Sequence, residues 1–225
     1  MCAKSIALDG PAGVGKSTIA KAVARELELI YIDTGAMFRG LSVYITEREC
    51  DPNDKGCVAE LIKEADVKIR YIDGAQHVIL NSEDVTDKLR TEKISSAASI
   101  ISQYPEVRKK LLDLQRKMAE CDNVIMDGRD IGTVVLPDAD LKIFLTADPK
   151  VRAERRYNQL LEQGKAGGFT VEDIMNEMVL RDKRDTERKE APLVKAQDAV
   201  LVDTSYMDIE AVKNEIISLF NKKVQ

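Results

Sequence analysis

The sequence contains no tryptophan, and only 4% of its 225 residues are aromatic. It also has no surplus of positive charge, because 34 lysines and arginines stand against 39 aspartates and glutamates, for a net charge of −5. Proteins that bind polynucleotides gain most of their non-specific affinity from a basic surface, so this balance argues against that class. With 44% hydrophobic and 32% charged residues, the composition is typical of a soluble globular protein with a core.

Long apolar runs and closely paired cysteines are missing too. The apolar stretch Ile6–Leu8 ends at Asp9, so it is too short for a secretory signal or a transmembrane helix. The cysteines are Cys2, Cys50, Cys57 and Cys121. They do not form the CxxC pairs of a zinc site, and so few in a chain of this length do not suggest a disulfide framework. We therefore expect a cytoplasmic protein with reduced thiols.

Short apolar runs alternate with helical patterns along the chain. Runs of this kind are typical of strands buried on both faces of a parallel sheet, joined by crossover helices. The length suits one large domain, or one domain with an insert. We predict a doubly wound α/β fold with a parallel five-stranded sheet, whose strands are Ser5–Asp9, Ile30–Asp33, Asn123–Asp127, Leu141–Ala147 and Ala199–Asp203.

One segment breaks this alternation. Residues 66–81 alternate apolar and polar side chains on both sides of Asp73-Gly74, a dipeptide strongly favoured in tight hairpin turns. An antiparallel hairpin inserted in a parallel α/β chain predicts a small subdomain over about residues 51–89. It could cover a substrate or be an excursion without function, and the segment alone does not decide between these.

The strongest chemical signal is the segment from Gly10 to Ser17, GPAGVGKS, which fits G-x-x-x-x-G-K-[ST] between a predicted strand and a predicted helix. Its glycines allow successive backbone N–H groups to surround a phosphate, and the helix N-terminus adds its positive end. Lys16 would reach the β and γ phosphates of a nucleotide, and Ser17 would bind Mg²⁺. The segment therefore predicts a phosphate-binding loop.

Such a loop alone does not separate kinases from GTPase switches or motor ATPases. A GTPase would need a guanine-reading N-K-x-D sequence, which the chain does not contain. An ATPase bound to nucleic acid would need a basic track, which the charge balance disfavours.

Four further segments carry a specific resemblance, namely DTGAMFR from Asp33 to Arg39, residues 81–90, DGRDIGT from Asp127 to Thr133, and RDKRDTER from Arg181 to Arg188. At these segments the chain resembles the bacterial cytidylate (CMP) kinases, a family of nucleoside monophosphate kinases, and the match runs from about Ser5 to Phe220. The resemblance implies Mg²⁺-assisted transfer of the ATP γ-phosphoryl group to CMP or dCMP. A phosphate acceptor is already an anion near neutral pH, so the reaction needs little help from a general base. This agrees with a chain that contains only one histidine.

The resemblance also implies three parts. Residues 1–50, 90–150 and 189–225 would form the core, residues 51–89 the insert that binds the nucleoside monophosphate, and residues 151–188 a helical lid with flanking helices. Part of the lid can be placed by spacing, because Arg181, Asp185 and Arg188 fall at i, i+4 and i+7 along one helical stripe. A solvated charged face is the alternative for this segment.

By resemblance, Lys16, Arg39 and Arg129 are the catalytic residues, with both arginines holding the CMP phosphate. A salt bridge on a helix surface is the alternative for the arginines. Asp127, at the end of an apolar strand, would order Mg²⁺ water or cap a helix. The implied ATP-binding residues are Gly10, Pro11, Ala12, Gly13, Val14, Gly15, Lys16, Ser17, Thr18, Arg155 and Arg156. The implied CMP-binding residues are Thr34, Arg39, Ser99, Arg108, Arg129, Asp130, Arg181, Asp185 and Arg188.

Base selection follows from hydrogen-bonding groups. Cytosine presents an N4 amino donor beside N3 and O2 acceptors, so its pocket needs a carboxylate and cationic or hydroxyl donors. By resemblance these are Asp130, Arg108 and Ser99, although Ser99 could be only a helix-surface hydroxyl. Phe38 departs from the Tyr that many relatives carry. We therefore expect a monomeric kinase acting on ATP and CMP or dCMP, with UMP or AMP as the alternative acceptor and with no nucleic acid polymer or membrane as partner.

Overall fold

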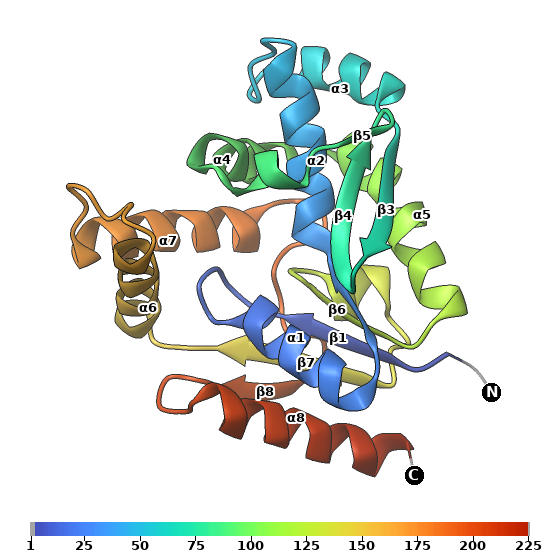
Figure 1. Cartoon of the computed structure of the whole chain (residues 1–225), viewed down its shortest axis with the longest axis vertical. Coiled ribbons are helices and arrows are strands. Elements are labelled where there is room, and N and C mark those ends of the chain that lie inside the picture. The colour runs from blue at the N-terminus through green and yellow to red at the C-terminus, as the bar shows by residue number, and fades with distance from the viewer. Residues whose placement is uncertain (1–2, 225) are drawn as a thin grey trace. The chain divides into compact units, whose positions relative to one another are not determined.

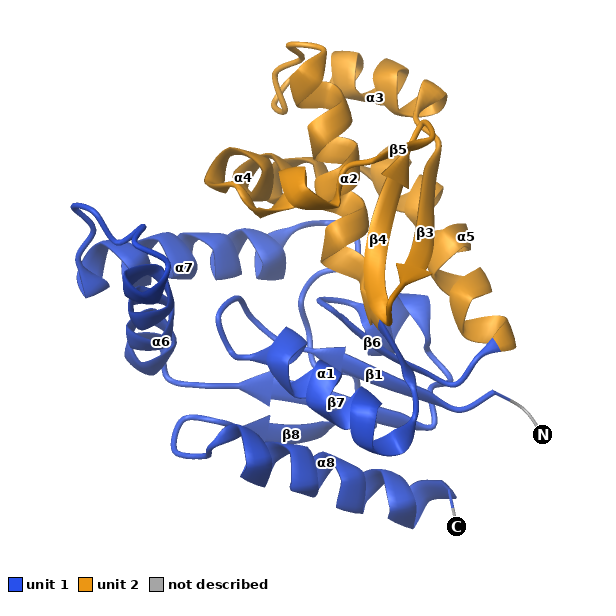
Figure 2. Cartoon of the chain, in the orientation of Figure 1, with its two compact units in different colours: residues 1–31, 122–225 blue, residues 32–121 orange. Residues whose placement is uncertain are grey.

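The structure is a computed structural model that describes residues 3–224. Met1, Cys2 and Gln225 lie outside the described residues. The chain forms two compact units, unit 1 with residues 1–31 and 122–225 and unit 2 with residues 32–121 (Figure 2). The predicted insert at 51–89 falls within unit 2 and the predicted lid at 151–188 within unit 1. The functions given to these two segments stay predictions.

The α/β fold with a five-stranded parallel sheet is confirmed (Figure 1). The strand order is β2-β6-β1-β7-β8, and β1 lies between β6 and β7 in parallel register. Each strand begins and ends within one residue of its predicted bounds. The strands are β1 (Ser5–Asp9), β2 (Ile30–Asp33), β6 (Val124–Gly128), β7 (Leu141–Thr146) and β8 (Val200–Asp203).

The helices of unit 1 follow the strands as crossover connections. Helices α1 and α8 pack against each other beside the sheet, and a core of fully buried side chains such as Leu8, Ile125 and Ile216 fills the space between helices and strands. The other two long helices pack together through a small cluster of Ala153, Ile174 and Met178. The helices are α1 (Lys16–Leu27), a π-helical turn (Ile131–Val135), α6 (Pro149–Glu162), α7 (Val171–Glu187) and α8 (Ile209–Val224).

Unit 2 contains the predicted hairpin. Strands β3 and β4 pair antiparallel, and Asp73 and Gly74 both have positive φ, at 50° and 75°, as a tight hairpin turn requires. The sequence did not reveal a third strand, β5, because it has only two residues. The elements are α2 (Thr34–Glu47), α3 (Lys55–Glu64), β3 (Val67–Ile72), β4 (Ala75–Leu80), β5 (Glu83–Asp84), a 3₁₀ helix (Thr86–Arg90), α4 (Glu92–Ile101) and α5 (Pro105–Cys121).

Helix α2 is the centre of unit 2, where it packs against α4 and β4. The close approach to β4 depends on Gly40, because a Cβ at this position would lie 2.8 Å from Cγ1 of Val78. Any larger side chain would push the strand and the helix apart. The hairpin is therefore fixed to the helix that follows β2 and carries Arg39.

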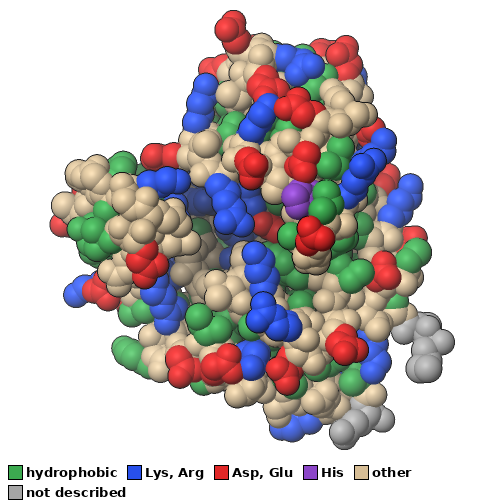
Figure 3. Space-filling model, in the orientation of Figure 1, with side chains coloured by type: hydrophobic (Ala, Val, Ile, Leu, Met, Phe, Trp, Pro, Cys, Tyr) green, Lys and Arg blue, Asp and Glu red, His purple; other side chains and the backbone are tan. Residues whose placement is uncertain are grey.

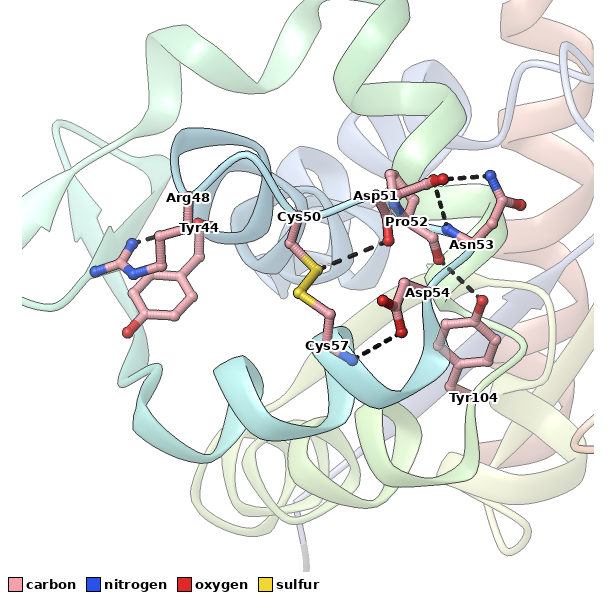
Figure 4. The surroundings of a disulfide bond; sticks show 9 residues. All are labelled: Tyr44, Arg48, Cys50, Asp51, Pro52, Asn53, Asp54, Cys57 and Tyr104. Atoms are coloured by element: carbon pink, nitrogen blue, oxygen red, sulfur yellow. Dashed lines mark hydrogen bonds between the residues drawn. A yellow bond between two sulfur atoms is a disulfide. The ribbon is translucent and has the colours of Figure 1, made fainter.

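The prediction of reduced thiols is wrong for Cys50 and Cys57, which form a disulfide over a separation of seven residues (Figure 4). Cys50 closes the end of α2, where its N–H donates to the carbonyl of Ile45, and Asp54 caps α3 by accepting from the N–H of Cys57 at 3.0 Å. The turn between two helix ends brings the sulfurs together, and spacing in the sequence does not show this. Cys121 is a free, exposed thiol.

Within residues 3–224, no helix is both long and apolar enough to cross a membrane. In the space-filling view, acidic and basic side chains are interspersed over the visible surface of unit 2 and around helix α8 (Figure 3). This distribution agrees with the balanced charge of the sequence, because opposite charges alternate where the solvent meets the protein.

Candidate active site

The phosphate loop follows β1 and ends where α1 begins. Gly10, Gly13 and Gly15 all have positive φ, at 150°, 73° and 92°. At Gly10 glycine is also required by space, since a Cβ would lie only 2.4 Å from the carbonyl oxygen of Leu145 on β7. The glycines thus let the loop turn tightly against the sheet, as a phosphate-binding loop requires.

Lys16 lies inside this loop and is only 6% exposed. Its Nζ donates to the carbonyl oxygens of Gly10 and Pro11 at 2.7 and 2.6 Å. Burial, followed by the positive charge of Arg129, holds the pKa of Lys16 well below its ordinary value. The lysine is thus held at the centre of the loop by acceptors that a phosphate would replace.

Ser17 and Asp127 supply oxygen atoms beside the loop. The hydroxyl of Ser17 donates to Oδ2 of Asp127 at 2.9 Å, and the hydroxyl of Tyr31 donates to Oδ1 at 3.2 Å. A hydroxyl and a carboxylate are hard oxygen ligands, and Mg²⁺ characteristically uses one or two carboxylates together with substrate phosphates. No group of three or more His, Cys, Asp or Glu side chains suited to a metal occurs among residues 3–224. The pair therefore fits Mg²⁺ bound with a nucleotide.

Asp9 connects the end of β1 to the turn after β6. Its carboxylate accepts from the backbone N–H groups of Ile131 and Gly132, both at 2.8 Å. Burial raises the pKa of Asp9 to about 6, although the two N–H donors act in the opposite direction. Sequence reasoning gave Asp9 no role, although a polar residue at the carboxyl end of a buried strand is a signal for one.

Arg129 and the end of α7 form a buried ionic cluster. Nε of Arg129 donates to Asp185 at 2.9 Å, and Arg188 donates to Asp130 at 3.4 Å. Burial alone would raise the pKa of Asp185, but Arg129, Arg181 and Arg188 together hold it below its ordinary value. Burial alone would likewise lower the pKa of Arg129, and Asp185 keeps it raised.

All five of these residues were predicted to bind CMP, and the structure brings them together within unit 1. Asp130, Asp185 and Arg188 are buried, at 5%, 4% and 7% exposure. The cluster holds three guanidinium groups around the carboxylate of Asp185, and guanidinium groups are donors suited to phosphate oxygens.

The arginines of α6 take different directions. Arg155 donates to the carbonyl of Thr204 at 2.6 Å, and Arg156 donates to Gln159 at 2.8 Å on the exposed face of α6. Arg152, which has no predicted role, is buried and donates to the carbonyl of Ala12 in the phosphate loop at 2.9 Å. Arg155 and Arg156 were both predicted to approach ATP. Arg155 binds Thr204, which contacts the loop, whereas Arg156 forms a hydrogen bond within its own helix.

Thr204 is a residue that sequence reasoning missed. It follows β8 and is 1% exposed, and its hydroxyl lies 3.4 Å from the carbonyl oxygen of Val14 in the loop and 3.2 Å from that of Thr146 at the end of β7. Thr204 therefore links the phosphate loop to Arg155. Its place after the carboxyl end of a strand was the available signal, since ligands of open α/β sheets bind at this edge.

In unit 2, the residues that follow β2 form the start of α2. Asp33 caps the helix by accepting from the N–H of Ala36 at 2.9 Å, and it accepts from Arg39 at 2.7 Å. Thr34, the first helical residue, is buried. Arg39 thus forms a salt bridge, which was the alternative to a role in phosphate binding. However, the Nε of Arg39 is buried without a hydrogen-bond partner.

Ser99 and Arg108 lie on successive helices of the same unit. Arg108 donates to the carbonyl of Ser102 at 3.1 Å, and the hydroxyl of Ser102 donates to the carbonyl of Ser99 at 3.0 Å. The guanidinium of Arg108 lies 5.6 Å from the ring centre of Phe38, within cation–π range. The Oγ of Ser99 is buried without a hydrogen-bond partner. A ligand that forms a hydrogen bond with this hydroxyl would remove the desolvation cost of leaving it unpaired.

A family model described as cytidylate kinase matches residues 6–222 of this chain. The matched range contains the phosphate loop, the ionic cluster and both helices of the Ser99 and Arg108 pair. The chain belongs to the cytidylate kinase family.

Curated cytidylate kinases from two bacteria show the extent of the likeness. The chain is 44% identical to the protein of Carboxydothermus hydrogenoformans over 97% of each sequence. It is also 44% identical to that of Caldicellulosiruptor bescii, over 98% of this chain and 97% of the relative. Cytidylate kinases are thus similar to this chain over nearly its whole length.

Solved structures support the fold alone. An uncharacterized protein from Eubacterium ventriosum superposes with a TM-score of 0.52 at 15% identity, covering 97% of this chain and 98% of that one. A gluconokinase from Sinorhizobium meliloti superposes with a TM-score of 0.50 at 13% identity, covering 97% and 92%. The α/β architecture of this cytidylate kinase family member is therefore shared with proteins of distant sequence.

Proposed function

We propose that the protein transfers the γ-phosphoryl group of ATP to CMP or dCMP, giving ADP and CDP or dCDP. The match of the cytidylate kinase family model over residues 6–222 carries this proposal. The phosphate loop supports it independently, because Lys16 and the loop N–H groups provide the donors that nucleotide phosphates need.

ATP binds on the phosphate loop, where residues 10–18 surround its phosphates. Lys16 exchanges the carbonyls of Gly10 and Pro11 for phosphate oxygens and neutralises charge that develops during transfer. Ser17 and Asp127 would hold Mg²⁺, which would supply positive charge that neutralises the phosphate oxygens. Arg155 and Arg156 of α6 contribute further positive charge toward ATP.

The proposed ligands of the CMP phosphate are Arg39 in unit 2 and Arg129, Arg181 and Arg188 in unit 1. A guanidinium group can bind two phosphate oxygens at once. Here Arg39 donates one hydrogen bond to Asp33, and Arg129 donates one to Asp185. Asp185 accepts from the ribose, and Thr34 supports the phosphate with its hydroxyl. Because the acceptor is an anion, this site aligns and neutralises and needs little general base.

Cytosine is selected by Ser99, Arg108 and Asp130. The carboxylate of Asp130 accepts from the N4 amino group, and the hydroxyl of Ser99 and the guanidinium of Arg108 serve the ring acceptors. The unsatisfied, buried Oγ of Ser99 supports this assignment. Uracil would present O4 to the carboxylate instead of a donor, and such a mismatch costs roughly 1–3 kcal/mol per unpaired group.

We further propose that the protein acts as a monomer in the cytoplasm, where its two substrates are available. The experiment that tests the function is an acceptor panel with a coupled assay for ADP release. CMP and dCMP should give higher kcat/KM than UMP, AMP, GMP and dTMP. Preference for UMP or AMP would support the alternative, another nucleoside monophosphate kinase, and would overturn the cytosine assignment.

A further inference from the structure

The phosphate loop already binds a carboxylate of the protein. The backbone N–H of Ala12 donates to Oδ1 of Asp182 at 3.1 Å. Asp182 lies on α7, in the predicted lid, and belongs to unit 1 together with the loop. A loop built to present N–H groups to anions thus holds an anionic side chain at one of them.

A second residue completes the contact. Arg152 of α6 donates through the same nitrogen, Nη1, to the carbonyl of Ala12 and to Oδ2 of Asp182. Both polar groups of Ala12, its N–H and its carbonyl, are therefore bound by an ion pair from the two lid helices. The side chains of Arg152 and Asp182 are only 5% and 18% exposed, so solvent screens this pair little.

The packing of α7 shows that the contact involves a helix face. Met178 lies one helical turn before Asp182 on the same side of α7. Its Cε would lie 2.8 Å from a Cβ added to Gly13, the residue after Ala12. Helix α7 therefore meets two consecutive loop residues, one through an apolar contact and one through the carboxylate.

In the phosphate loop, the ammonium group of Lys16 and the N–H of Ala12 both donate to acceptors of the protein itself. Lys16 donates to the carbonyls of Gly10 and Pro11, and Ala12 donates to Asp182. An incoming triphosphate would replace all of these acceptors, and it would bring further negative charge beside the carboxylate of Asp182. The phosphate and the carboxylate of Asp182 would repel each other strongly, because little solvent would lie between the two negative charges.

We propose that Asp182 is a positioning residue that latches the lid helix α7 to the phosphate loop and competes with the ATP phosphates for it. Binding of ATP releases Asp182 from Ala12 and leaves Arg152 beside the phosphates as a donor. The latch thus couples occupation of the loop to movement of the lid. This inference rests on the proposed function, since it takes ATP as the nucleotide that the loop binds.

The test is the affinity for ATP in the absence of CMP. In Asp182→Asn the side chain keeps an oxygen that can accept from Ala12 but loses its charge, so the competition weakens. We expect the Kd for ATP, measured by isothermal titration calorimetry, to fall roughly fivefold or more. The KM for ATP should fall likewise, while kcat and the KM for CMP change less than about twofold, because the latch is released before phosphoryl transfer.

A purely structural role predicts the opposite sign, since a loosened loop would bind ATP more weakly. Asp182→Ser, a second neutral variant, should behave as Asp182→Asn does. The matched control is Glu187→Gln, which removes one negative charge from an exposed position on the same helix and should leave the Kd for ATP unchanged within about twofold.

A Kd for ATP that rises, or stays within twofold of wild type, in both Asp182 variants would overturn the latch, and so would loss of the fold in both. These outcomes differ from failure of the proposed function. If the wild-type protein bound ATP but did not phosphorylate CMP, the titrations would still decide whether Asp182 competes for the loop.

Discussion

The hydroxyl of Ser17 donates to Oδ2 of Asp127 at 2.9 Å, which joins the end of the phosphate loop to the adjacent strand β6 of the same unit. The pair holds a hydroxyl and a carboxylate at the point where the nucleotide phosphates are proposed to bind. Because Asp127 is 4% exposed, its charge is only weakly screened and favours a cation nearby.

Asp127→Asn should weaken metal binding more than nucleotide binding. The amide keeps an oxygen near Ser17 but removes the negative charge that attracts Mg²⁺. We expect the Mg²⁺ concentration for half-maximal activity to rise by roughly tenfold at saturating ATP and CMP. Asp138→Asn, at a surface position between β6 and β7, is the control. An unchanged Mg²⁺ requirement in folded Asp127→Asn would remove Asp127 from the metal site.

Lys16→Ala should lower kcat by at least roughly 10²-fold while the protein stays folded, because Lys16 is proposed to neutralise negative charge that develops in the transition state. Its loss leaves the carbonyls of Gly10 and Pro11 without the ammonium donor, so a modest loss of thermal stability is also expected. Steady-state kinetics and thermal unfolding measure the two effects separately. A folded Lys16→Ala protein with wild-type kcat would refute the role of the loop.

Asp130→Ala should raise the KM for CMP more than the KM for ATP, because Asp130 is proposed to accept from the cytosine amino group. The same change removes the buried carboxylate that accepts a hydrogen bond from Arg188 at 3.4 Å. Thermal stability should therefore decrease as well. Ser99→Ala is the companion variant, since the hydroxyl of Ser99 has no partner to lose and its removal should affect CMP without destabilising the protein. Equal effects of Asp130→Ala on both substrates would place Asp130 outside the base pocket.

Asp9 predicts a pH-dependent difference in stability. Its pKa is raised to about 6 by burial, so its contribution to stability is fully present below its unfolded pKa and is lost as the pH rises through about 6. Relative to Asp9→Asn, the free energy of unfolding of wild type should therefore decrease by about 3 kcal/mol between roughly pH 3.5 and 6.5.

Chemical denaturation of both proteins across this pH range measures that difference. The comparison cancels carboxylates common to both proteins, such as Asp84, whose pKa is lowered to about 2 by hydrogen bonds from Thr86 and whose contribution is lost in the opposite direction, as the pH falls. A difference between wild type and Asp9→Asn that does not change with pH would mean that Asp9 titrates near its ordinary pKa in the folded protein.

The sheet and the phosphate loop could be predicted because each is encoded locally. The strands are short apolar runs that end in polar or glycine residues, and β1 and β2 have the predicted bounds. The hairpin turn at Asp73 and Gly74 follows from a dipeptide that favours positive φ. The loop conformation follows from the glycine spacing that its backbone needs.

What could not be predicted depends on contacts between distant segments. The Asp182 contact with Ala12 spans 170 residues, and nothing in the local pattern of α7 distinguishes Asp182 from the other acidic residues beside it. The disulfide between Cys50 and Cys57 depends on how two helix ends meet around a turn. Thr204 acquires its contacts only when β8 lies beside β7. Packing, rather than propensity, decides each of these.

Direct identification of the transferred group tests the central claim most sharply. Wild-type protein is incubated with Mg²⁺, CMP and ATP labelled at the γ-phosphorus, and the products are separated and identified. Transfer of the γ-phosphoryl group to CMP predicts that the label appears in the β-phosphoryl group of CDP in the same amount as ADP is formed. It also predicts that Lys16→Ala slows the formation of both products by at least roughly 10²-fold. Label recovered only as inorganic phosphate, with CMP unchanged, would contradict it.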